Sequence, residues 1–531
     1  MSSRRADFVI VGGGSAGCVL AARLSEEPGV DVILIEAGGA GDVDDIRIPA
    51  HSRNLFLSQY DYAFYSEPEP ALKGRRVYQP RGRVLGGSSA INMMIYVRGS
   101  AADYDEWADL GNRGWDFASV LPYFKKAEDN ERGASHFHGA GGPLGVSDSR
   151  SRNALAEAFV EAAIEAGLPA NPDFNGERQE GAGFFQLTQR NGERCSAAAA
   201  YLEPVRGRAN LHVLTETRAL RILLKHGRAS GVEVATAAGT ETIGADREVI
   251  LAAGAFQSPQ LLMLSGIGPE TELRRHGIKA EQDMAGVGAN LHDHQGVLMS
   301  WETHEAIGLW NVISDTNRER FDRERRGPLT SNYVEVGAFA RIAGSAEVEI
   351  ELIAMPGITH IDKSRRATQP GLTIFPTLLK PRSRGRVGLR SADPLAPPRI
   401  ELGFYSDGAD LETMVEGVRI AAGIVSQPSL ARHISAPHEA PATGDRKTLV
   451  EHIVAQTQTI YHAAGTCAMG EVVDADLRVR GIQGLRVADA SVMPAPVRGN
   501  INAPVIMVAE KAADMILDRR PAVAKGSVVP A

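Results

Sequence analysis

The first 36 residues constrain the fold of this chain more than any other stretch. Phe8 to Val11 form a short apolar run rich in branched residues, glycines follow at once, and a helical apolar spacing begins at Cys18. The pattern predicts a strand, a tight turn and a helix. Gly12, Gly14 and Gly17 match G-x-G-x-x-G, whose glycines permit the turn, the close approach of a pyrophosphate and the packing of helix on strand. The N-terminus of the helix would offer its N–H groups to the phosphates.

Glu36 narrows the choice of ligand. It ends the apolar run 32–35, where a carboxylate can accept hydrogen bonds from an adenosine ribose and disfavours a 2′-phosphate, so FAD or NAD is expected rather than NADP. Residues 13–17 also match G-x-S-x-G, the nucleophile elbow of α/β-hydrolases. Such an elbow normally follows several βα units, whereas about ten residues precede this one, so the dinucleotide interpretation is favoured. A glycine-rich turn without a ligand is the remaining alternative.

Length and composition exclude several classes of protein. A chain of 531 residues is too long for one core, which predicts two domains or one interleaved body. The net charge of −8 argues against a nucleic-acid partner. Cys18, Cys195 and Cys467 are too few and too scattered for a disulfide framework, which favours a reducing compartment. No apolar stretch reaches the ~18 residues of a membrane span, and the start of the chain leaves no room for a signal region. We therefore expect a cytoplasmic protein without a membrane span.

Two further segments look suited to approach the same ligand. In 81–99, small residues lead into an apolar run that contains Asn92; they would let backbone N–H groups approach a bound ring, although an ordinary Gly-Ser turn with a capping Asn explains them too. The apolar run 249–253 predicts a strand that returns to the parallel sheet begun at residue 8. After it, Ser258 and Pro259 suit the start of a helix and Gly266 its end.

The remaining patterns predict a second sheet. Alternating runs between 211 and 234 suggest a half-exposed antiparallel sheet, and a further antiparallel sheet, suited to a substrate platform, is expected from the runs 333–340, 347–355, 372–379 and 386–390. Helices are expected at 103–130, 153–167, 407–427 and 446–456. The charged segment 305–330 could be a lid. His136-x-His138 and His292-x-His294 lack further ligands at metal spacing, so surface or supporting histidines are expected and no metal.

The chemistry is expected near the C-terminus. His462 lies in an apolar, glycine-rich turn, and Asn500 and Asn502 precede a helix predicted at 505–517, with Pro504 as its first residue. The positive end of that helix would favour negative charge on a nearby ring. A structural histidine and a capping asparagine are the ordinary alternatives.

Taken together, these motifs resemble the glucose-methanol-choline (GMC) oxidoreductases over nearly the whole chain: the N-terminal fingerprint, 81–99, 254–268, the turn around His462, and 487–500. The resemblance implies an α/β fold (α+β overall), with a Rossmann-type FAD-binding domain interleaved with a substrate domain on an antiparallel sheet. It also implies FAD and the oxidation of an alcohol. The FAD-binding domain would comprise 1–155, 195–300 and 457–520, and the substrate domain 156–194 and 301–456.

The resemblance also assigns residues. His462 aligns with the active-site histidine, which would act as general base, and Asn500 with the second catalytic position. The expected cofactor-binding residues are Gly12, Gly14, Ser15, Ala16, Gly17, Glu36, Ala37, Arg83, Gly87, Ser88, Asn92, Met93, Met94, Ala219, Ala253, Asp489, Ala490 and Asn502. Ala90 stands where some members carry a histidine that binds FAD covalently, so non-covalent FAD is expected. Ala463 replaces a proline common after the active-site histidine, which would loosen the turn.

Substrate and acceptor stay open at this stage. A primary alcohol would be oxidised to an aldehyde, and O2, a quinone-like acceptor as in a choline-type dehydrogenase, or another acceptor would reoxidise the flavin; Ile460 does not decide between them. The fold also hosts a hydroxynitrile lyase and a light-driven decarboxylase. Candidate pocket residues are Tyr333, Phe339, Phe375 and Tyr461. Glu335 could meet a cationic substrate such as choline, although a solvated strand face is the simpler explanation.

Overall fold

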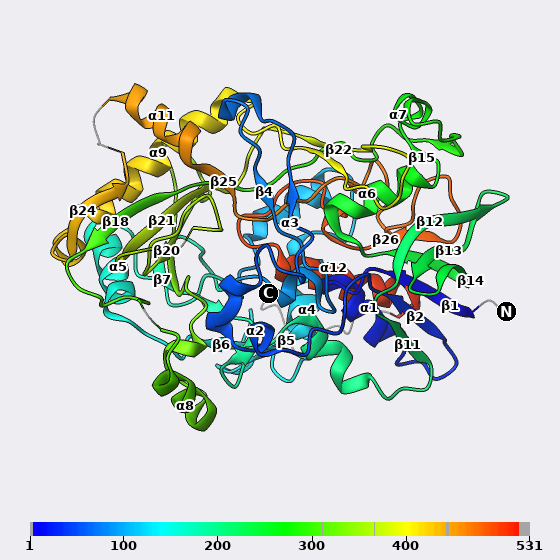
Figure 1. The fold of residues 1–531 in the computed structure, drawn as a ribbon, viewed down its shortest axis with the longest axis horizontal. Helices are drawn as coiled ribbons and strands as arrows, with labels where there is room; N and C mark the ends of the chain where they lie inside the picture. The colour runs from blue at the N-terminus through cyan, green and yellow to red at the C-terminus, as the bar shows by residue number, and fades with distance from the viewer. Residues whose placement is uncertain (1–3, 311, 366, 442–444, 520–531) are drawn as a thin grey trace, which may run out of the picture.

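The computed structural model describes residues 4–310, 312–365, 367–441 and 445–519. Two large β-sheets, flanked by helices, dominate this part of the chain; the first lies at the right of Figure 1 and the second at the left. The α/β fold class is confirmed. Blue, green and orange strands meet in the first sheet, because the N-terminal, middle and C-terminal parts of the chain all contribute strands to it.

The first sheet has the strand order β11-β2-β1-β14-β13-β12, with β26 beside β14. Its strands are β1 (Arg4–Val11), β2 (Val32–Ile35), β11 (Leu211–Leu214), β12 (Arg218–Lys225), β13 (Arg228–Thr236), β14 (Gly239–Leu251) and β26 (Leu485–Val487). β1 runs parallel to both β2 and β14. Helix α1 (Ser15–Leu24) packs on β1 and β2, and α12 (Asn502–Ile516) packs on α1. The apolar first strand is thus buried, as parallel strands covered by helices are.

One expectation for this sheet is wrong. Residues 211–214 do not join an antiparallel sheet: β11 runs parallel to β2, whereas β12 and β13 are antiparallel and continuous with β14. The alternation of apolar residues reports which face of a strand is buried and carries no information on the direction of its neighbour. The sequence pattern therefore predicted the strands and not their pairing.

The second sheet has the order β24-β18-β21-β20-β19-β7, with β17 between β21 and β25. Its strands are β7 (Gly181–Phe184), β17 (Gln295–Val297), β18 (Met299–Thr303), β19 (Val336–Ala340), β20 (Ile350–Met355), β21 (Gly371–Leu378), β24 (Ile434–Glu439) and β25 (Thr457–Thr459). All its pairings are antiparallel, as expected. β17 and β25 fall within ranges that the sequence analysis assigns to the FAD-binding domain, and that division stays a prediction.

The expected helices form with small shifts at their ends, and 103–130 contains two helices. Besides α1 and α12, the α-helices of the described residues are α2 (Asp44–Arg47), α3 (Ala101–Asp109), α4 (Phe117–Ala127), α5 (Ala154–Glu165), α6 (Gly254–Leu264), α7 (Glu270–Arg275), α8 (Asp315–Glu324), α9 (Gly408–Val425), α10 (Pro428–Ala431) and α11 (Arg446–Gln456), of which α2, α7 and α10 are not expected from the sequence. Short strands complete the fold: β3 (Phe64–Tyr65), β4 (Tyr78–Gln79), β5 (Glu128–Asn130), β6 (Leu144–Asp148), β8 (Gln186–Leu187), β9 (Gln189–Arg190), β10 (Glu193–Arg194), β15 (Ile267–Gly268), β16 (Gln282–Asp283), β22 (Arg386–Gly388) and β23 (Arg399–Glu401). The run 386–390 thus lies in β22, which pairs with β23 outside the second sheet.

The start of α6 differs from the expectation. The helix begins at Gly254, so Pro259 lies inside it and Ser258 is not its N-cap. Proline has no N–H, which leaves the carbonyl of Ala255 without its helical donor. Thr466 supplies the missing donor, since its Oγ1 donates to the Ala255 carbonyl at 2.6 Å. A tertiary contact therefore lets the helix run through the proline. In α12, likewise, Pro504 is the third residue and not the first.

The segment expected as a possible lid contains α8. Its Phe321 is fully buried, and Arg318 pairs with Asp44 at 2.7 Å. No described residue of 305–330 lines the large cavity presented below. A lid movement therefore stays a prediction. Among the helices of the described ranges, none has the length and apolarity that crossing a membrane requires.

Candidate active site

A large cavity is lined by residues of both sheets and of the helices α1, α6 and α12. It collects most of the sequence-predicted residues: Gly12, Gly14, Ser15, Ala16, Glu36, Ala37, Gly87, Ser88, Asn92, Met93, Met94, Ala219, Ala253, Asp489, Ala490 and Asn502, together with His462 and Asn500. Two predicted residues lie outside its lining. Gly17 packs within the turn, and Arg83 is exposed, with its guanidinium near the Tyr62 ring.

The glycine turn fits a dinucleotide. A Cβ on Gly17 would lie 1.9 Å from the carbonyl oxygen of Gly12, and one on Gly12 would lie 2.5 Å from that of Ala252. These two glycines are therefore required by the close packing of helix on strand. A Cβ on Gly14 would meet nothing nearer than 3.9 Å. Packing does not require a glycine there, but a ligand that approaches the backbone closely does.

Glu36 is anchored by the same turn. Its Oε2 accepts a hydrogen bond from the N–H of Gly13 at 2.9 Å, and its Oε1 accepts one from that of Gly38 at 2.8 Å. Burial raises the pKa of Glu36 to about 7, although these hydrogen bonds oppose the shift. Each carboxylate oxygen has a second lone pair, which is available to the hydroxyls of a ribose.

Two helix N-termini meet at the cavity. Ser15 begins α1 and Asn502 begins α12, and the Ser15 hydroxyl donates to the Asn502 Oδ1 at 2.8 Å. Both helices direct the positive ends of their dipoles to this region, which suits the phosphates and the negatively charged edge of a flavin. Two segments separated by almost the whole chain thus form one anion-favouring surface.

Asn92 lines the cavity and also holds its own loop. Its Oδ1 accepts hydrogen bonds from the N–H of Met94 at 3.0 Å and from the buried Arg194 guanidinium at 2.9 Å. Met94 has a φ of 58°, which is uncommon outside glycine. The turn-capping role considered for Asn92 is therefore present, in a loop that faces the cavity.

His462 is held between two side chains. Its Nδ1 lies 2.9 Å from the Nδ1 of His294, and its Nε2 lies 3.3 Å from the Nδ2 of Asn500. The two imidazole rings are perpendicular, at 88°. Burial lowers the pKa of His462 well below its usual range, and His294 and Arg81 add to the effect. Burial also lowers the pKa of His294 to about 4. Both rings are therefore neutral at pH 7.

These contacts select one tautomer of His462. The amide of Asn500 is placed with its Nδ2 toward the Nε2 of His462. In that orientation Asn500 donates, and the proton of His462 sits on Nδ1. That proton then points at the Nδ1 of His294, 2.9 Å away, and His294 carries its own proton on Nε2, which is buried and has no hydrogen-bond partner among the described residues. His462 consequently presents a lone pair on Nε2 toward the cavity, which is the form that a general base needs.

A buried carboxylate supports the turn of His462. The Oδ1 of Asp293 accepts the backbone N–H of His462 at 2.8 Å, and its Oδ2 accepts the hydroxyl of Thr459 at 2.5 Å. The guanidinium of Arg81 donates to the carbonyl of Tyr461, which has a φ of 76°. Sequence reasoning missed Asp293, Arg81 and the contact of His294. The only signal was an acidic residue between two histidines in a short buried segment.

Of the four aromatic side chains predicted to line a substrate pocket, three line the cavity and one does not. Tyr333, Phe375 and Tyr461 line the cavity, whereas Phe339 is buried away from it. Glu335 is fully buried and its Oε2 accepts from Asn153, so neither the pocket role nor the solvated strand face is found.

The other histidine pairs are not at the surface either. The Nδ1 and Nε2 of His138 lie 2.9 Å from Glu128 and Asp173, and these partners raise its pKa to about 9 although burial opposes the rise. His292 is buried as well. Of the four, the exposed His136 matches the surface alternative, and His294, in contact with His462, matches the alternative of a supporting histidine.

The fold, the glycine turn and the position of His462 define a flavin-dependent oxidoreductase. Residues 6–296 and 381–509 match the N-terminal and C-terminal models of the GMC oxidoreductases, and the chain belongs to this family. It is 39% identical to an alcohol dehydrogenase [acceptor] of Pseudomonas putida over 96% of this chain and 95% of that one. It is 41% identical to an oxygen-dependent choline dehydrogenase of Brucella anthropi over 97% and 96%.

Comparison with a solved structure supports the same family assignment. Pyridoxine 4-oxidase from Mesorbium loti superposes with a TM-score of 0.89 at 32% identity, over 97% of this chain and 100% of that one. FAD as cofactor and the oxidation of an alcohol are therefore confirmed. Ala90 offers no atom for a covalent link, and non-covalent attachment stays a prediction.

Proposed function

We propose that this enzyme oxidises a primary alcohol to an aldehyde, with His462 as general base and Asn500 as the residue that holds the alcohol oxygen. Bound FAD supplies the acceptor for the hydride that leaves the carbinol carbon. The Nε2 of His462 takes the hydroxyl proton, so that one proton and one hydride leave the alcohol together. Asn500 restricts the orientation of the substrate oxygen beside that nitrogen. The position of His462 on the cavity, between His294 and Asn500, is the observation that carries the proposal.

Replacement of the base tests this assignment. His462→Ala should retain the yellow, FAD-bound protein and lower the rate of anaerobic flavin reduction by ~10² or more. Asn500→Ala is the companion variant, and it should also raise the substrate concentration needed for half-maximal reduction. Unchanged reduction in His462→Ala would remove this residue from the mechanism.

The charge of the cavity favours an alcohol without a positive charge. Arg53, Lys363 and Arg365 all line it. The acidic lining residues are Glu36 and Asp489, and both lie beside the glycine turns of the first sheet. Burial, with Arg53 nearby, lowers the pKa of Lys363 to about 7. A quaternary ammonium group would therefore meet like charges, which disfavours choline although choline dehydrogenases are among the relatives.

A matched pair of substrates separates these two possibilities. Choline and 3,3-dimethylbutan-1-ol have nearly the same shape and differ in one charge. The uncharged alcohol should reduce the flavin with the higher ratio of rate to half-saturating concentration. Faster reduction by choline would instead establish the choline-type activity.

The acceptor and the location belong to the proposal as well. Hydrogen peroxide formed under air would identify O2 as acceptor; turnover that requires an added quinone would identify a dehydrogenase. A cytoplasmic location is supported by the three cysteines, which are buried and free. Fractionation of the source cells tests it.

A further inference from the structure

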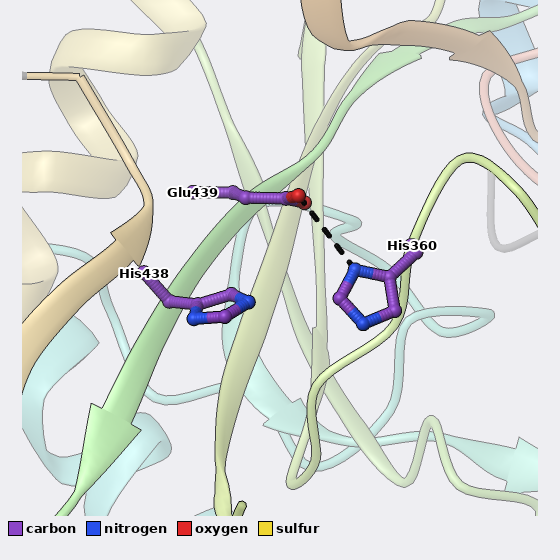
Figure 2. Close-up of side chains that lie close together, drawn as sticks. All are labelled: His360, His438 and Glu439. Atoms are coloured by element: carbon purple, nitrogen blue, oxygen red, sulfur yellow. Dashed lines mark ion pairs between the residues drawn. The ribbon is translucent and has the colours of Figure 1, made fainter. Parts of the chain in front are cut away.

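A cluster of metal-ligating side chains lies away from the active site. His360 belongs to the connection between β20 and β21, and His438 and Glu439 end strand β24. One possible ligand atom from each of the three lies within 4.8 Å of the others. The Nδ1 of His360 points at the Glu439 carboxylate, 3.6 Å from its Oε1, and the His438 ring faces His360 (Figure 2).

An irregularity in β24 brings two consecutive residues to this cluster. Adjacent residues of a regular strand point to opposite faces of the sheet. Here Glu439 pairs with Ser300 and Pro437 pairs with Trp301, so His438 is an extra residue in the ladder. Such a bulge redirects side chains and is frequent beside functional sites. Without it His438 and Glu439 would face apart.

Two atoms of the cluster lack hydrogen-bond partners. His360 is 4% exposed. Its Nδ1 and the Oε2 of Glu439 are buried, and no described residue forms a hydrogen bond with either. Buried polar atoms without a partner are rare, and a bound ion is one of their recognised explanations.

A second carboxylate orients His438. The Nδ1 of His438 lies 3.2 Å from the Oε1 of Glu302, and the same oxygen accepts from the amide of Gln369 at 2.9 Å. The amide nitrogen of Gln369 also lies 3.1 Å from this Nδ1. When His438 carries its proton on Nδ1 and donates it to Glu302, the lone pair on Nε2 is available to a metal. Carboxylate partners of this kind hold the ring and raise the basicity of metal-binding histidines.

We propose that His360, His438 and Glu439 form a binding site for a divalent transition metal, with Zn²⁺ as the best match. Two imidazoles and one carboxylate, with a water as fourth ligand, are a common donor set for zinc, and imidazole disfavours Ca²⁺ and Mg²⁺. Zinc bonds of about 2.0–2.2 Å at tetrahedral angles place ligand atoms about 3.4 Å apart. The 3.6 Å between His360 and Glu439 is close to this separation.

The position of the site gives the metal a structural role. The connection that carries His360 also carries Thr359, Lys363 and Arg365, which line the active-site cavity. A metal would join this connection to β24 and so hold the part of the cavity wall that Thr359, Lys363 and Arg365 form. Zinc should therefore raise the Tm and change the half-saturating substrate concentration more than the maximal rate of flavin reduction.

Metal titration of the tag-free holoenzyme tests the site. After treatment with EDTA and desalting, calorimetry with ZnCl2 should show one site per chain, and elemental analysis one retained zinc. His360→Ala and Glu439→Gln should lose this site, and Glu302→Ala should weaken it about 10–100-fold. His433→Ala, a histidine just before the same strand, is the matched control and should bind as the parent does. Retained FAD absorbance verifies that each variant is folded.

Cobalt gives a readout that needs no variant. Co²⁺ in a tetrahedral site with histidine ligands absorbs at wavelengths beyond the flavin bands, and one equivalent should produce this absorption in the parent protein. Zinc should then displace it. No stoichiometric binding at 100 µM Zn²⁺, a Co²⁺ spectrum without tetrahedral bands, or equal binding by His360→Ala would overturn the proposal and leave an ordinary His360–Glu439 ion pair.

Discussion

His294 offers the sharpest test of how the protein prepares its base. The side chain does not line the cavity, and its only contact with the chemistry is the 2.9 Å hydrogen bond between the two Nδ1 atoms. His294→Leu removes this acceptor, whereas His294→Asn keeps an oxygen near the same place. The pair of variants therefore separates the loss of the hydrogen bond from the loss of the ring.

The expected loss of rate in His294→Leu follows from which ring nitrogen of His462 carries the proton. In His294→Leu the Nδ1–H of His462 is buried without an acceptor, which costs about 1–3 kcal/mol. The proton then moves to Nε2, where a rotated Asn500 amide can accept it through Oδ1. That form cannot take a proton from the alcohol. At 1.4 kcal/mol per factor of ten, flavin reduction should become about 5–150-fold slower. His294→Asn should recover the rate to within about a factor of three, because neutral hydrogen bonds differ little in net free energy.

Anaerobic stopped-flow reduction measures this directly. The parent rate should be constant at neutral pH and fall only in acid, as His462 takes up a proton below the ordinary imidazole pKa of about 6.5. In His294→Leu the rate should stay low at every pH, since the population of the reactive tautomer does not depend on pH. Equal rates for the parent and His294→Leu would refute the tautomer argument. An equal loss of rate in His294→Leu and His294→Asn would show that the packing of the His294 ring, and not its hydrogen bond, supports His462.

Three further predictions concern the cofactor and stability. Glu36→Leu should lose FAD during dialysis, because the acceptor for two backbone N–H groups disappears; retained flavin would contradict this. Thr466→Val should lower the free energy of unfolding by about 1–3 kcal/mol in denaturant titration, since the Ala255 carbonyl opposite Pro259 loses its donor. Burial raises the pKa of Glu351 to about 8, and neither carboxylate oxygen has a hydrogen-bond partner in the described chain. Its protonated form is preferred on folding, so stability is lost as pH rises from about 4.5 to 8, and Glu351→Gln should raise the Tm more at pH 9 than at pH 6.

The sequence predicted the local parts of the site well. Gly12, Gly14 and Glu36 are recognisable because a strand, a turn and a helix follow one another within a few residues, and backbone sterics decide such units. The helix around 446–456 is found at the predicted residues for the same reason. The start of α6 was missed because Thr466, far along the chain, replaces the N–H that Pro259 lacks.

By itself the sequence predicted a dinucleotide site in the first 36 residues, and its resemblance to the family assigned the two catalytic positions to His462 and Asn500, which stays a prediction. Only the tertiary structure decided how the base is prepared. The hydrogen bond between the two Nδ1 atoms and the support from Asp293 arise from contacts between segments about 170 residues apart. Burial then sets the protonation of His462, and burial is a property of the packed chain that no local pattern encodes.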